Sequence, residues 1–310
     1  MENTRAKTTR NSLILLLTAT IWGMAFVSQS KGMDYMHPFT FNGVRSLIGA
    51  AGILVYILIS RKIAGDKAAK LDWKLNVKAG LLCGIFLTIA STLQQFGIKY
   101  TSVGKAGFIT TLYIIFVPMF GIFLKKKVAP VVWAAAGMAA VGMYLLCMTE
   151  SLRLGAGDIM VFLCAIAFAI QIMTVDHYAA RIDGAVVSCI QFTVCGVVCC
   201  IGALIWGQPT FGQIQEGLGA LLYAGVLSCG VGYTLQIVGQ KGLNPTVAAL
   251  IMSLESVIAT ISGWIAYKIG FLSTDQTLTP RQIAGCVIVF AAVILVQLPP
   301  EWFCFGKKNA

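Results

Sequence analysis

Ten apolar segments, each near 20 residues long, divide the chain and limit what it can fold into. A helix of about 20 apolar residues, rising ~1.5 Å per residue, crosses the ~30 Å hydrocarbon core of a bilayer. Proline, glycine and clustered lysine fill the breaks between segments and act as turn and stop signals. Within the fourth segment, Pro118 predicts a kink. The pattern predicts ten membrane helices, at 12–31, 38–60, 75–98, 104–124, 128–148, 156–175, 185–207, 215–238, 244–267 and 281–298.

The charged residues are too few for a soluble protein of this length. They make up 11% of the 310 residues, against about 25% in soluble domains. The net charge of +11 comes from lysine and arginine in the breaks, without an aromatic-rich basic surface, so no nucleic-acid partner is predicted. Most of the ten cysteines lie in apolar segments and none forms a Cys-x-x-Cys pair, so no metal or cofactor is predicted. The composition indicates an integral membrane protein surrounded by the lipid bilayer.

Lysine and arginine are distributed unequally between the two sides of the predicted helices. Sixteen lie in the two terminal tails and the even-numbered breaks or beside them, and six lie in or beside the odd-numbered breaks. Basic residues are retained on the cytoplasmic side of a membrane. The distribution therefore predicts a multi-pass protein of the cell membrane with both termini in the cytoplasm.

The two halves of the chain carry related sequences. Thr92-Leu93-Gln94-x-x-Gly97-x-Lys99 recurs as Thr234-Leu235-Gln236-x-x-Gly239-x-Lys241, an offset of 142 residues. The same offset aligns Glu255 with Tyr113, and an offset of 146 aligns Arg45 with Gln191. Each half has five predicted helices, an odd number, so the second half is inverted relative to the first. The predicted fold is an all-α membrane protein with two inverted five-helix repeats around a central cavity, an architecture of secondary transporters.

Four short motifs resemble the EamA family of the drug/metabolite transporter superfamily. They are Ile21-Trp22-Gly23-x-Ala25-Phe26, Phe41-Asn42-x-x-Arg45, Ala106-Gly107-Phe108-Ile109-Thr110 and Ser253-Leu254-Glu255. The resemblance implies two EamA-like repeats, at 12–148 and 156–298, flanked by cytoplasmic tails at 1–11 and 299–310. It also implies movement of small metabolites, often as export.

Glu255 is the candidate site residue that the sequence singles out most clearly. It lies near the middle of the ninth apolar segment, where an acidic side chain costs about 2.5–3.5 kcal/mol on insertion scales. Such a group faces a partner or a water-filled cavity. One interpretation places Glu255 in a polar transport cavity, where it would be protonated or paired in one state. The other is a structural hydrogen bond between packed helices.

Arg45 and its neighbours form the second candidate group. Asn42 and Arg45 are three residues apart and share a helix face. Arg45 is either a cavity cation that binds an anionic group or Glu255, or a side chain that reaches the interface or packs helices. Its repeat partner Gln191 is also polar, which favours a lined cavity.

Amide and aromatic side chains complete the predicted site. Gln94, Gln171 and Gln236 lie in apolar segments, where they either line the cavity or hydrogen-bond helices together. Trp22 and Tyr113 lie too deep in their segments for interface anchors, so they are predicted to flank a small-molecule substrate.

The sequence favours a secondary transporter that exports small metabolites or drugs by alternating access, with proton coupling left open. No G-x-x-x-x-G-K-[ST] segment is present to bind ATP. The alternatives are a membrane-embedded enzyme acting on lipid-linked substrates, which needs a catalytic cluster such as H-E-x-x-H, and a channel, which needs a selectivity ring or loop. The sequence contains neither pattern, so an enzyme is not predicted. It leaves the substrate, the coupling ion and the oligomeric state open.

Overall fold

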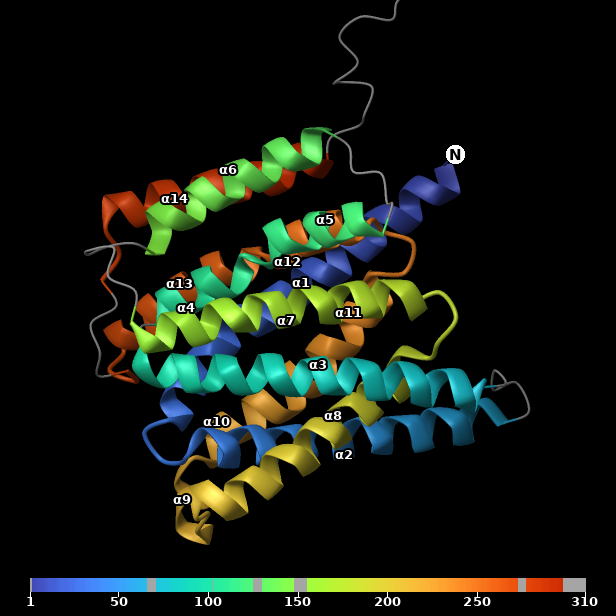
Figure 1. Ribbon diagram of the computed structural model, residues 1–310, viewed down its shortest axis with the longest axis vertical. Coiled ribbons are helices and arrows are strands. Elements are labelled where there is room, and N and C mark those ends of the chain that lie inside the picture. Colours follow the sequence, from blue (N-terminus) through green and yellow to red (C-terminus); the bar gives the residue numbers. More distant parts are fainter. Residues whose placement is uncertain are drawn as a thin grey trace, which may run out of the picture.

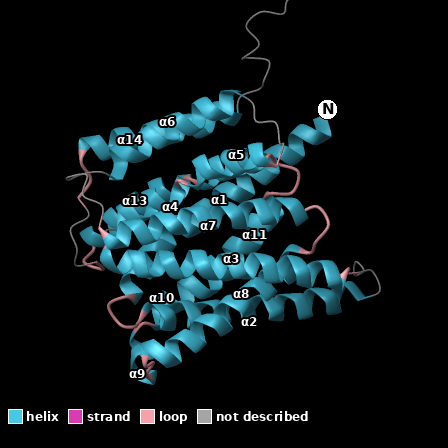
Figure 2. Cartoon of the chain, viewed as in Figure 1, coloured by secondary structure: helices cyan, strands magenta, loops and turns pink. Residues whose placement is uncertain are grey.

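The computed structural model describes residues 2–65, 71–101, 103–124, 130–147, 155–272 and 277–297. In these ranges the chain forms helices and loops without a strand (Figure 2). The helices are α1 (Glu2–Gly32), α2 (Pro38–Ala64), α3 (Trp73–Tyr100), α4 (Val103–Thr111), α5 (Tyr113–Phe123), α6 (Pro130–Cys147), α7 (Ala156–Tyr178), α8 (Gly184–Gly202), η2 (Ala203–Gly207), α9 (Phe211–Glu216), α10 (Leu218–Leu222), η3 (Tyr223–Gly232), α11 (Tyr233–Gly239), α12 (Pro245–Met252), α13 (Leu254–Lys268) and α14 (Pro280–Gln297). The predicted tail at 299–310 lies outside the described residues, and the predicted N-terminal tail is helical from Glu2.

The prediction of an all-α membrane fold is confirmed. Eight helical spans are long and apolar enough to cross a membrane: Lys7–Gly32, Pro38–Ala64, Trp73–Tyr100, Val103–Phe123, Ala156–Tyr178, Gly184–Gly207, Leu218–Gly239 and Pro245–Lys268. Two shorter apolar helices, Pro130–Gly142 and Pro280–Leu295, occupy the predicted fifth and tenth segments. Many large apolar side chains on the outside of the bundle are exposed, as a surface in contact with lipid requires.

The two five-helix halves interlock rather than standing apart. Helix α2 packs on α8, α6 packs on α14, and the α4–α5 span packs on the α12–α13 span, so repeat-related helices meet one another. Helix α3 packs on α7. The helix related to α3 by the repeat, α11, packs on α1 in the same way. Figure 1 shows the α6–α14 pair at the top of the bundle and α2 with α8 at the bottom. This reciprocal packing is what an approximate two-fold axis between inverted halves produces.

Polar side chains determine where several helices begin. Asp72 Oδ1 accepts a hydrogen bond from the N–H of Leu75 at 3.0 Å, ahead of α3. Asn244 Oδ1 accepts one from the N–H of Thr246 at 2.9 Å, ahead of α12. These side chains satisfy donors that the first turn of a helix leaves free. Pro245, at the first position of α12, lacks such a donor and has a φ suited to helix.

Glycine allows two pairs of helices to approach closely. A Cβ atom on Gly97 in α3 would lie 2.9 Å from the carbonyl oxygen of Gly157 in α7. A Cβ atom on Gly142 in α6 would lie 2.9 Å from the carbonyl oxygen of Gly285 in α14. Both distances are shorter than a methyl group tolerates, so the backbones meet directly, as at many membrane helix interfaces.

The fourth and ninth spans are interrupted at related positions. Leu112 separates α4 from α5, and Ser253 separates α12 from α13, within one residue of the repeat offset. At the first interruption the N–H of Leu112 bonds to the carbonyl of Ile109 at 3.2 Å, a tightened turn. The interruption precedes Pro118, where the sequence predicted a kink, and α5 continues through that proline.

Candidate functional site

A small cavity lies inside the bundle, with walls from both halves. Water-sized molecules can occupy about 30 Å³ of it, which is room for on the order of two waters. The lining combines an acid, a base, amides, hydroxyls and aromatic rings. The lining residues are Trp22, Phe26, Gln29, Arg45, Gln94, Thr110, Tyr113, Phe168, Gln171, Ile172, Ser228, Tyr233, Gln236 and Glu255.

The structure brings seven of the nine predicted site residues together around this cavity: Glu255, Arg45, Trp22, Tyr113, Gln94, Gln171 and Gln236. Asn42 and Gln191 are fully buried but do not line it. The Nδ2 of Asn42 donates to the carbonyl of Ser91 at 2.9 Å, which ties α2 to α3. These two residues lie in the helix packing instead. Substrate contact by the other seven stays a prediction.

Seven lining residues were not among the predicted site residues: Phe26, Gln29, Thr110, Phe168, Ile172, Ser228 and Tyr233. Some carried a signal in the sequence. Gln29 is an amide in an apolar segment, and Phe168 aligns with Trp22 in the repeat. Ile172 carried none, since apolar side chains of this kind fill every segment.

Glu255 and Tyr113 meet at the centre of the site. The hydroxyl of Tyr113 donates to Oε1 of Glu255 at 3.0 Å, and both side chains are buried. The two positions are related by the repeat offset of 142. Two positions exchanged by a two-fold axis can touch only close to that axis. No basic nitrogen of the described residues lies within 4 Å of the Glu255 carboxyl group, so this acid has no ionic partner there.

Arg45 lines the same cavity and also lacks an ionic partner. It is 5% exposed, and its guanidinium lies 5.4 Å from the centroid of the Phe41 ring. Its Nε is buried without a hydrogen bond, and no carboxylate of the described residues lies within 4 Å. A buried charge without a partner is costly. The guanidinium is therefore available to an anionic group that enters the cavity.

The amides leave further hydrogen-bonding groups unused. Nε2 of Gln236 donates to Oε1 of Gln171 at 3.2 Å, and Nε2 of Gln94 donates to Oγ1 of Thr110 at 3.2 Å. Within the described part of the chain, Nε2 of Gln171, Oε1 of Gln236 and Oε1 of Gln29 are buried without partners. Buried amides normally satisfy these groups, so the cavity offers both donors and acceptors to a polar ligand.

Aromatic rings form another wall. Trp22 and Tyr233 lie with ring centroids 4.5 Å apart, and the Tyr233 ring meets Phe192 edge-on. Nε1 of Trp22 donates to the carbonyl of Ser228 at 3.4 Å, within the π-helical stretch η3. A π-helix widens the backbone and is frequent at functional sites. Here it joins the first-half helix α1 to the second-half wall of the cavity.

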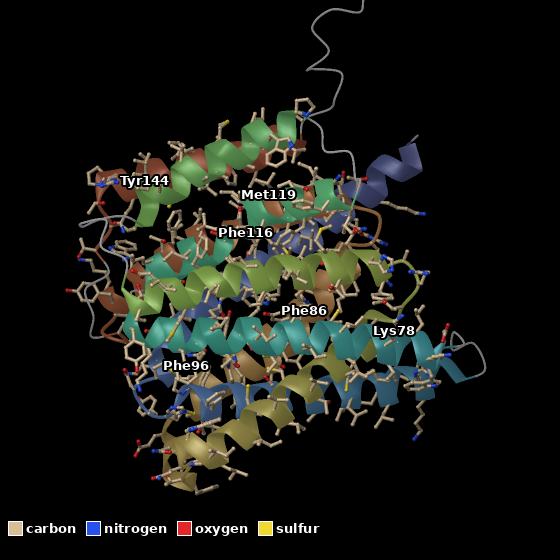
Figure 3. All side chains as sticks on the ribbon, in the orientation of Figure 1. Lys78, Phe86, Phe96, Phe116, Met119 and Tyr144 are labelled. Atoms are coloured by element: carbon tan, nitrogen blue, oxygen red, sulfur yellow. The ribbon has the colours of Figure 1, made fainter. Side chains whose placement is uncertain are left out.

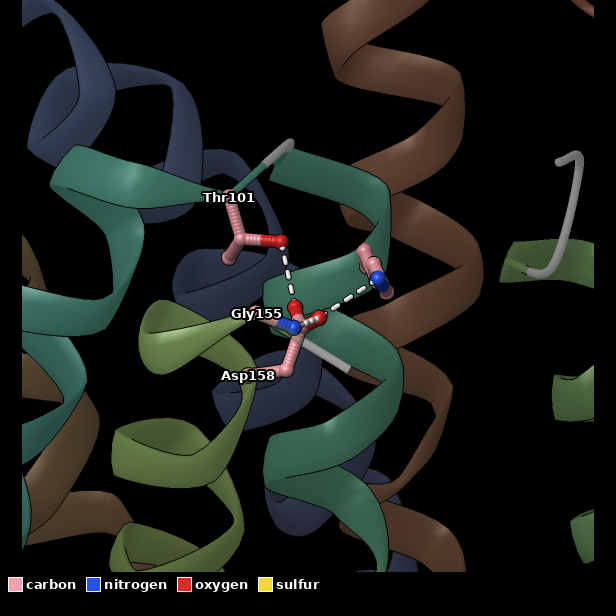
Figure 4. A network of polar contacts seen from close by, with 4 residues as sticks. Thr101, Gly155 and Asp158 are labelled. Carbon is pink, nitrogen blue, oxygen red and sulfur yellow. Dashed lines mark hydrogen bonds and ion pairs between the residues drawn. The ribbon is translucent and has the colours of Figure 1, made fainter. Parts of the chain in front are cut away.

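A buried polar network ties the halves together at one end of the bundle (Figure 4). Asp158, in the first turn of α7, accepts hydrogen bonds from Oγ1 of Thr101 at 2.8 Å and from the N–H of Gly155 at 2.9 Å. Nζ of Lys105 in α4 forms an ion pair with Oδ2 of Asp158 at 2.6 Å. Asp158 belongs to the second half, whereas Thr101 and Lys105 belong to the first.

A related contact closes the other end. Nδ2 of Asn11 in α1 donates to the carbonyl of Lys241, in the turn between α11 and α12, at 2.7 Å. Asn11 is 5% exposed. The start of each half thus bonds to the third-to-fourth-span turn of the opposite half. The cavity lies between these two contacts.

Asp158→Asn is expected to destabilise the protein by about 1–3 kcal/mol, because it removes a buried charge-assisted bond and leaves Lys105 without its carboxylate. The single amide oxygen can accept from Oγ1 of Thr101 or from the N–H of Gly155 but not from both, so the variant also loses one of these two hydrogen bonds. The measurement is the thermal unfolding midpoint of the purified protein in detergent.

Asp34→Asn is the matched control. Asp34 also pairs with a lysine, Lys31, at 2.9 Å, but its side chain is 52% exposed. An exposed pair contributes less than about 1 kcal/mol. If Asp158→Asn and Asp34→Asn lower the thermal unfolding midpoint equally, the Asp158 network does not hold the halves together.

The fold and the cavity define a class of protein: a two-repeat helical membrane transporter. The family model of the EamA-like transporter family matches residues 10–148 and 155–298. The chain belongs to the EamA-like transporter family.

Relatives agree with this assignment, and a solved structure shares the fold. An uncharacterized transporter of Archaeoglobus fulgidus is 28% identical over 92% of this chain and 84% of its own length. The uncharacterized transporter YwfM of Bacillus subtilis is 24% identical over 94% of each chain. One crystal structure shares the fold with a TM-score of 0.71, at 16% identity over 93% of this chain and 96% of that chain.

Proposed function

We propose that this protein is a secondary transporter that exports a small metabolite or drug by alternating access, with Glu255 as the proton-coupling group. The single observation that carries the proposal is the small cavity between the halves, where Arg45 and Glu255 both lack an ionic partner among the described residues. The substrate crosses unchanged, since the family and its relatives are transporters.

Alternating access is supported by contacts between the halves at both ends of the bundle. Asp158 with Lys105 ties one end, and Asn11 with the carbonyl of Lys241 ties the other. A space for two waters cannot hold a metabolite, so the halves must move apart for binding. Breaking one contact and keeping the other opens the cavity to one side, as the rocking of inverted repeats requires.

The charges support a substrate with an anionic group. Arg45 offers a guanidinium without a carboxylate, and guanidinium binds carboxylate or phosphate through paired hydrogen bonds. Glu255 lines the same cavity without a basic partner among the described residues, which leaves its carboxyl group free to carry the proton. The amides and aromatic rings surround the rest of the molecule.

The distribution of basic residues supports an orientation in the cell membrane with both termini in the cytoplasm. Several of these residues, Lys125–Lys127 among them, lie outside the described part of the chain. The export direction rests on the family resemblance.

The test is transport into inside-out vesicles, where export appears as uptake. The panel pairs radiolabelled amino acids with simple carboxylates, amines and neutral sugars, with and without an imposed pH gradient. We expect gradient-driven accumulation of compounds that carry an anionic group. Accumulation of neutral sugars alone would contradict the role of Arg45. Substrate uptake that does not depend on the pH gradient would identify the protein as a facilitator.

A further inference from the structure

A second, larger crevice opens on the outside of the bundle between α2 and the η3–α11 span. Its inner part, here called the lateral groove, has a volume of about 420 Å³. It is lined by Gly49, Gly52, Ile53, Tyr56, Val226, Gly230, Val231, Thr234, Leu235 and Val238. Tyr56, Val226 and Val231 at its edges are exposed, so the groove faces the lipid side of the helices. Apart from Tyr56 and Thr234, it offers hydrocarbon and glycine.

The lateral groove continues into a charged opening, here called the basic mouth. This space of about 620 Å³ shares Tyr56, Thr234 and Val238 with the groove. It lies where α2 ends, α3 begins, α7 turns into α8 and α11 ends. Lys78, near the start of α3, marks this end of the bundle in Figure 3, and the N-terminus lies at the same end in Figure 1.

Three cations line the basic mouth: Arg61, Arg181 and Lys241. None has a carboxylate within 4 Å among the residues that the structure describes. Nζ of Lys241 donates to the carbonyl of Ile182 at 3.4 Å, and Arg181 donates to the carbonyl of His177 at 3.3 Å. Lys241 and Arg181 are therefore hydrogen-bonded, but no described carboxylate neutralises the charge of any of the three cations.

The two acids in the mouth are already engaged. Oδ1 of Asp72 accepts from the N–H of Leu75 at the start of α3. Oδ1 of Asp183 accepts from the N–H groups of Ala185 and Val186 at the start of α8. Hydrogen bonds from backbone N–H groups leave both negative charges in place, so three positive charges face two negative ones and the described lining keeps a net charge of +1.

We propose that this crevice binds one anionic phospholipid, with its headgroup phosphate at the basic mouth and an acyl chain in the lateral groove. A soluble anion would fill the mouth but leave the apolar groove empty. A zwitterionic lipid would fill the groove but leave the three cations without a net opposite charge. Basic pockets between membrane helices are known to bind anionic headgroups. The lipid comes from the leaflet at this end of the bundle.

The glycines explain why a straight hydrocarbon chain fits. A Cβ atom on Gly52 would meet nothing within 4 Å, and one on Gly230 would come no closer than 3.5 Å to its nearest neighbour. The groove floor is therefore open space beside bare backbone. A larger side chain at Gly52 would occupy that space without displacing the helix packing.

The test is native mass spectrometry of the full-length protein with equal amounts of dioleoyl phosphatidylglycerol and dioleoyl phosphatidylcholine. We expect wild type to retain one phosphatidylglycerol preferentially. Each cation near an anionic headgroup contributes roughly a fivefold change in affinity. The triple variant Arg61→Gln, Arg181→Gln, Lys241→Gln should lose the preference by more than about tenfold. Gly52→Phe should reduce binding of both lipids.

Matched controls separate this site from general surface charge. Lys99→Gln, Lys268→Gln and Arg281→Gln remove the same charge at the opposite end, and Gly137→Phe adds the same ring at an exposed glycine of α6 with open space around it. Both controls should keep the preference. An equal loss in the charge control, or displacement by inorganic phosphate with no effect of Gly52→Phe, would overturn the proposal.

Discussion

Glu255→Gln is expected to abolish gradient-driven accumulation of substrate while leaving downhill exchange measurable. An amide keeps the size of the side chain and still accepts the hydrogen bond from Tyr113, but it carries no exchangeable charge. The structure places this carboxylate 3.0 Å from the Tyr113 hydroxyl, beside the approximate two-fold axis. A group beside that axis is about equally close to both halves. Its protonation can therefore affect both the inward-open and the outward-open state. The measurement is uptake into inside-out vesicles with and without a pH gradient.

Three further variants distinguish coupling from structure. Glu255→Asp keeps the titrating group and should restore part of the gradient-driven accumulation. Tyr113→Phe removes only the donor, at a cost of about 0.5–3 kcal/mol for the lost hydrogen bond, and should slow transport without uncoupling it. Glu216→Gln changes an exposed acid at the end of α9 and should have no effect. If Glu255→Gln accumulates substrate as wild type does, Glu255 is structural.

The repeat in the sequence predicted which residues are equivalent but not which residues touch. Tyr113 and Glu255 were aligned by an offset of 142, and the structure shows that they share a hydrogen bond. That contact depends on how closely the broken spans pack at the axis. The interruption at Leu112 was also missed, because Pro118 carried the only visible signal in that segment. Local tightening of a helix by neighbouring hydroxyls and packing leaves no comparable mark in a sequence.

Helix faces explain the two site residues that the structure moves away from the cavity. Asn42 lies three residues from Arg45, so spacing placed both on one face. In a bundle, however, one face of a helix can contact more than one neighbouring helix. Asn42 donates a hydrogen bond to the carbonyl of Ser91 in α3 and does not line the cavity. Gln191 aligns with Arg45 in the repeat but does not line the cavity. Apolar membrane segments are buried on several sides at once, so polarity alone does not identify which neighbour a side chain meets.

Arg45→Gln is expected to weaken substrate binding at least about thirtyfold while leaving the fold intact. Truncating one partner of a buried charge pair costs about 2–5 kcal/mol, and 2 kcal/mol corresponds to roughly thirtyfold in affinity. Among the described residues no carboxylate pairs with the guanidinium. Removing it therefore breaks no ionic contact, so the thermal unfolding midpoint should stay unchanged or rise.

The contrast between binding and stability is what identifies Arg45 as a ligand for the substrate's anionic group. A packing residue would lose stability when replaced, whereas a binding residue loses affinity only. Arg45→Lys keeps the charge but loses the paired hydrogen bonds of guanidinium, so it should fall between wild type and glutamine. Arg281→Gln, at an exposed position, is the control. The measurements are substrate affinity and unfolding temperature on the same preparations. A lower unfolding midpoint with unchanged affinity would assign Arg45 to helix packing and leave the anionic group of the substrate without a partner in this cavity.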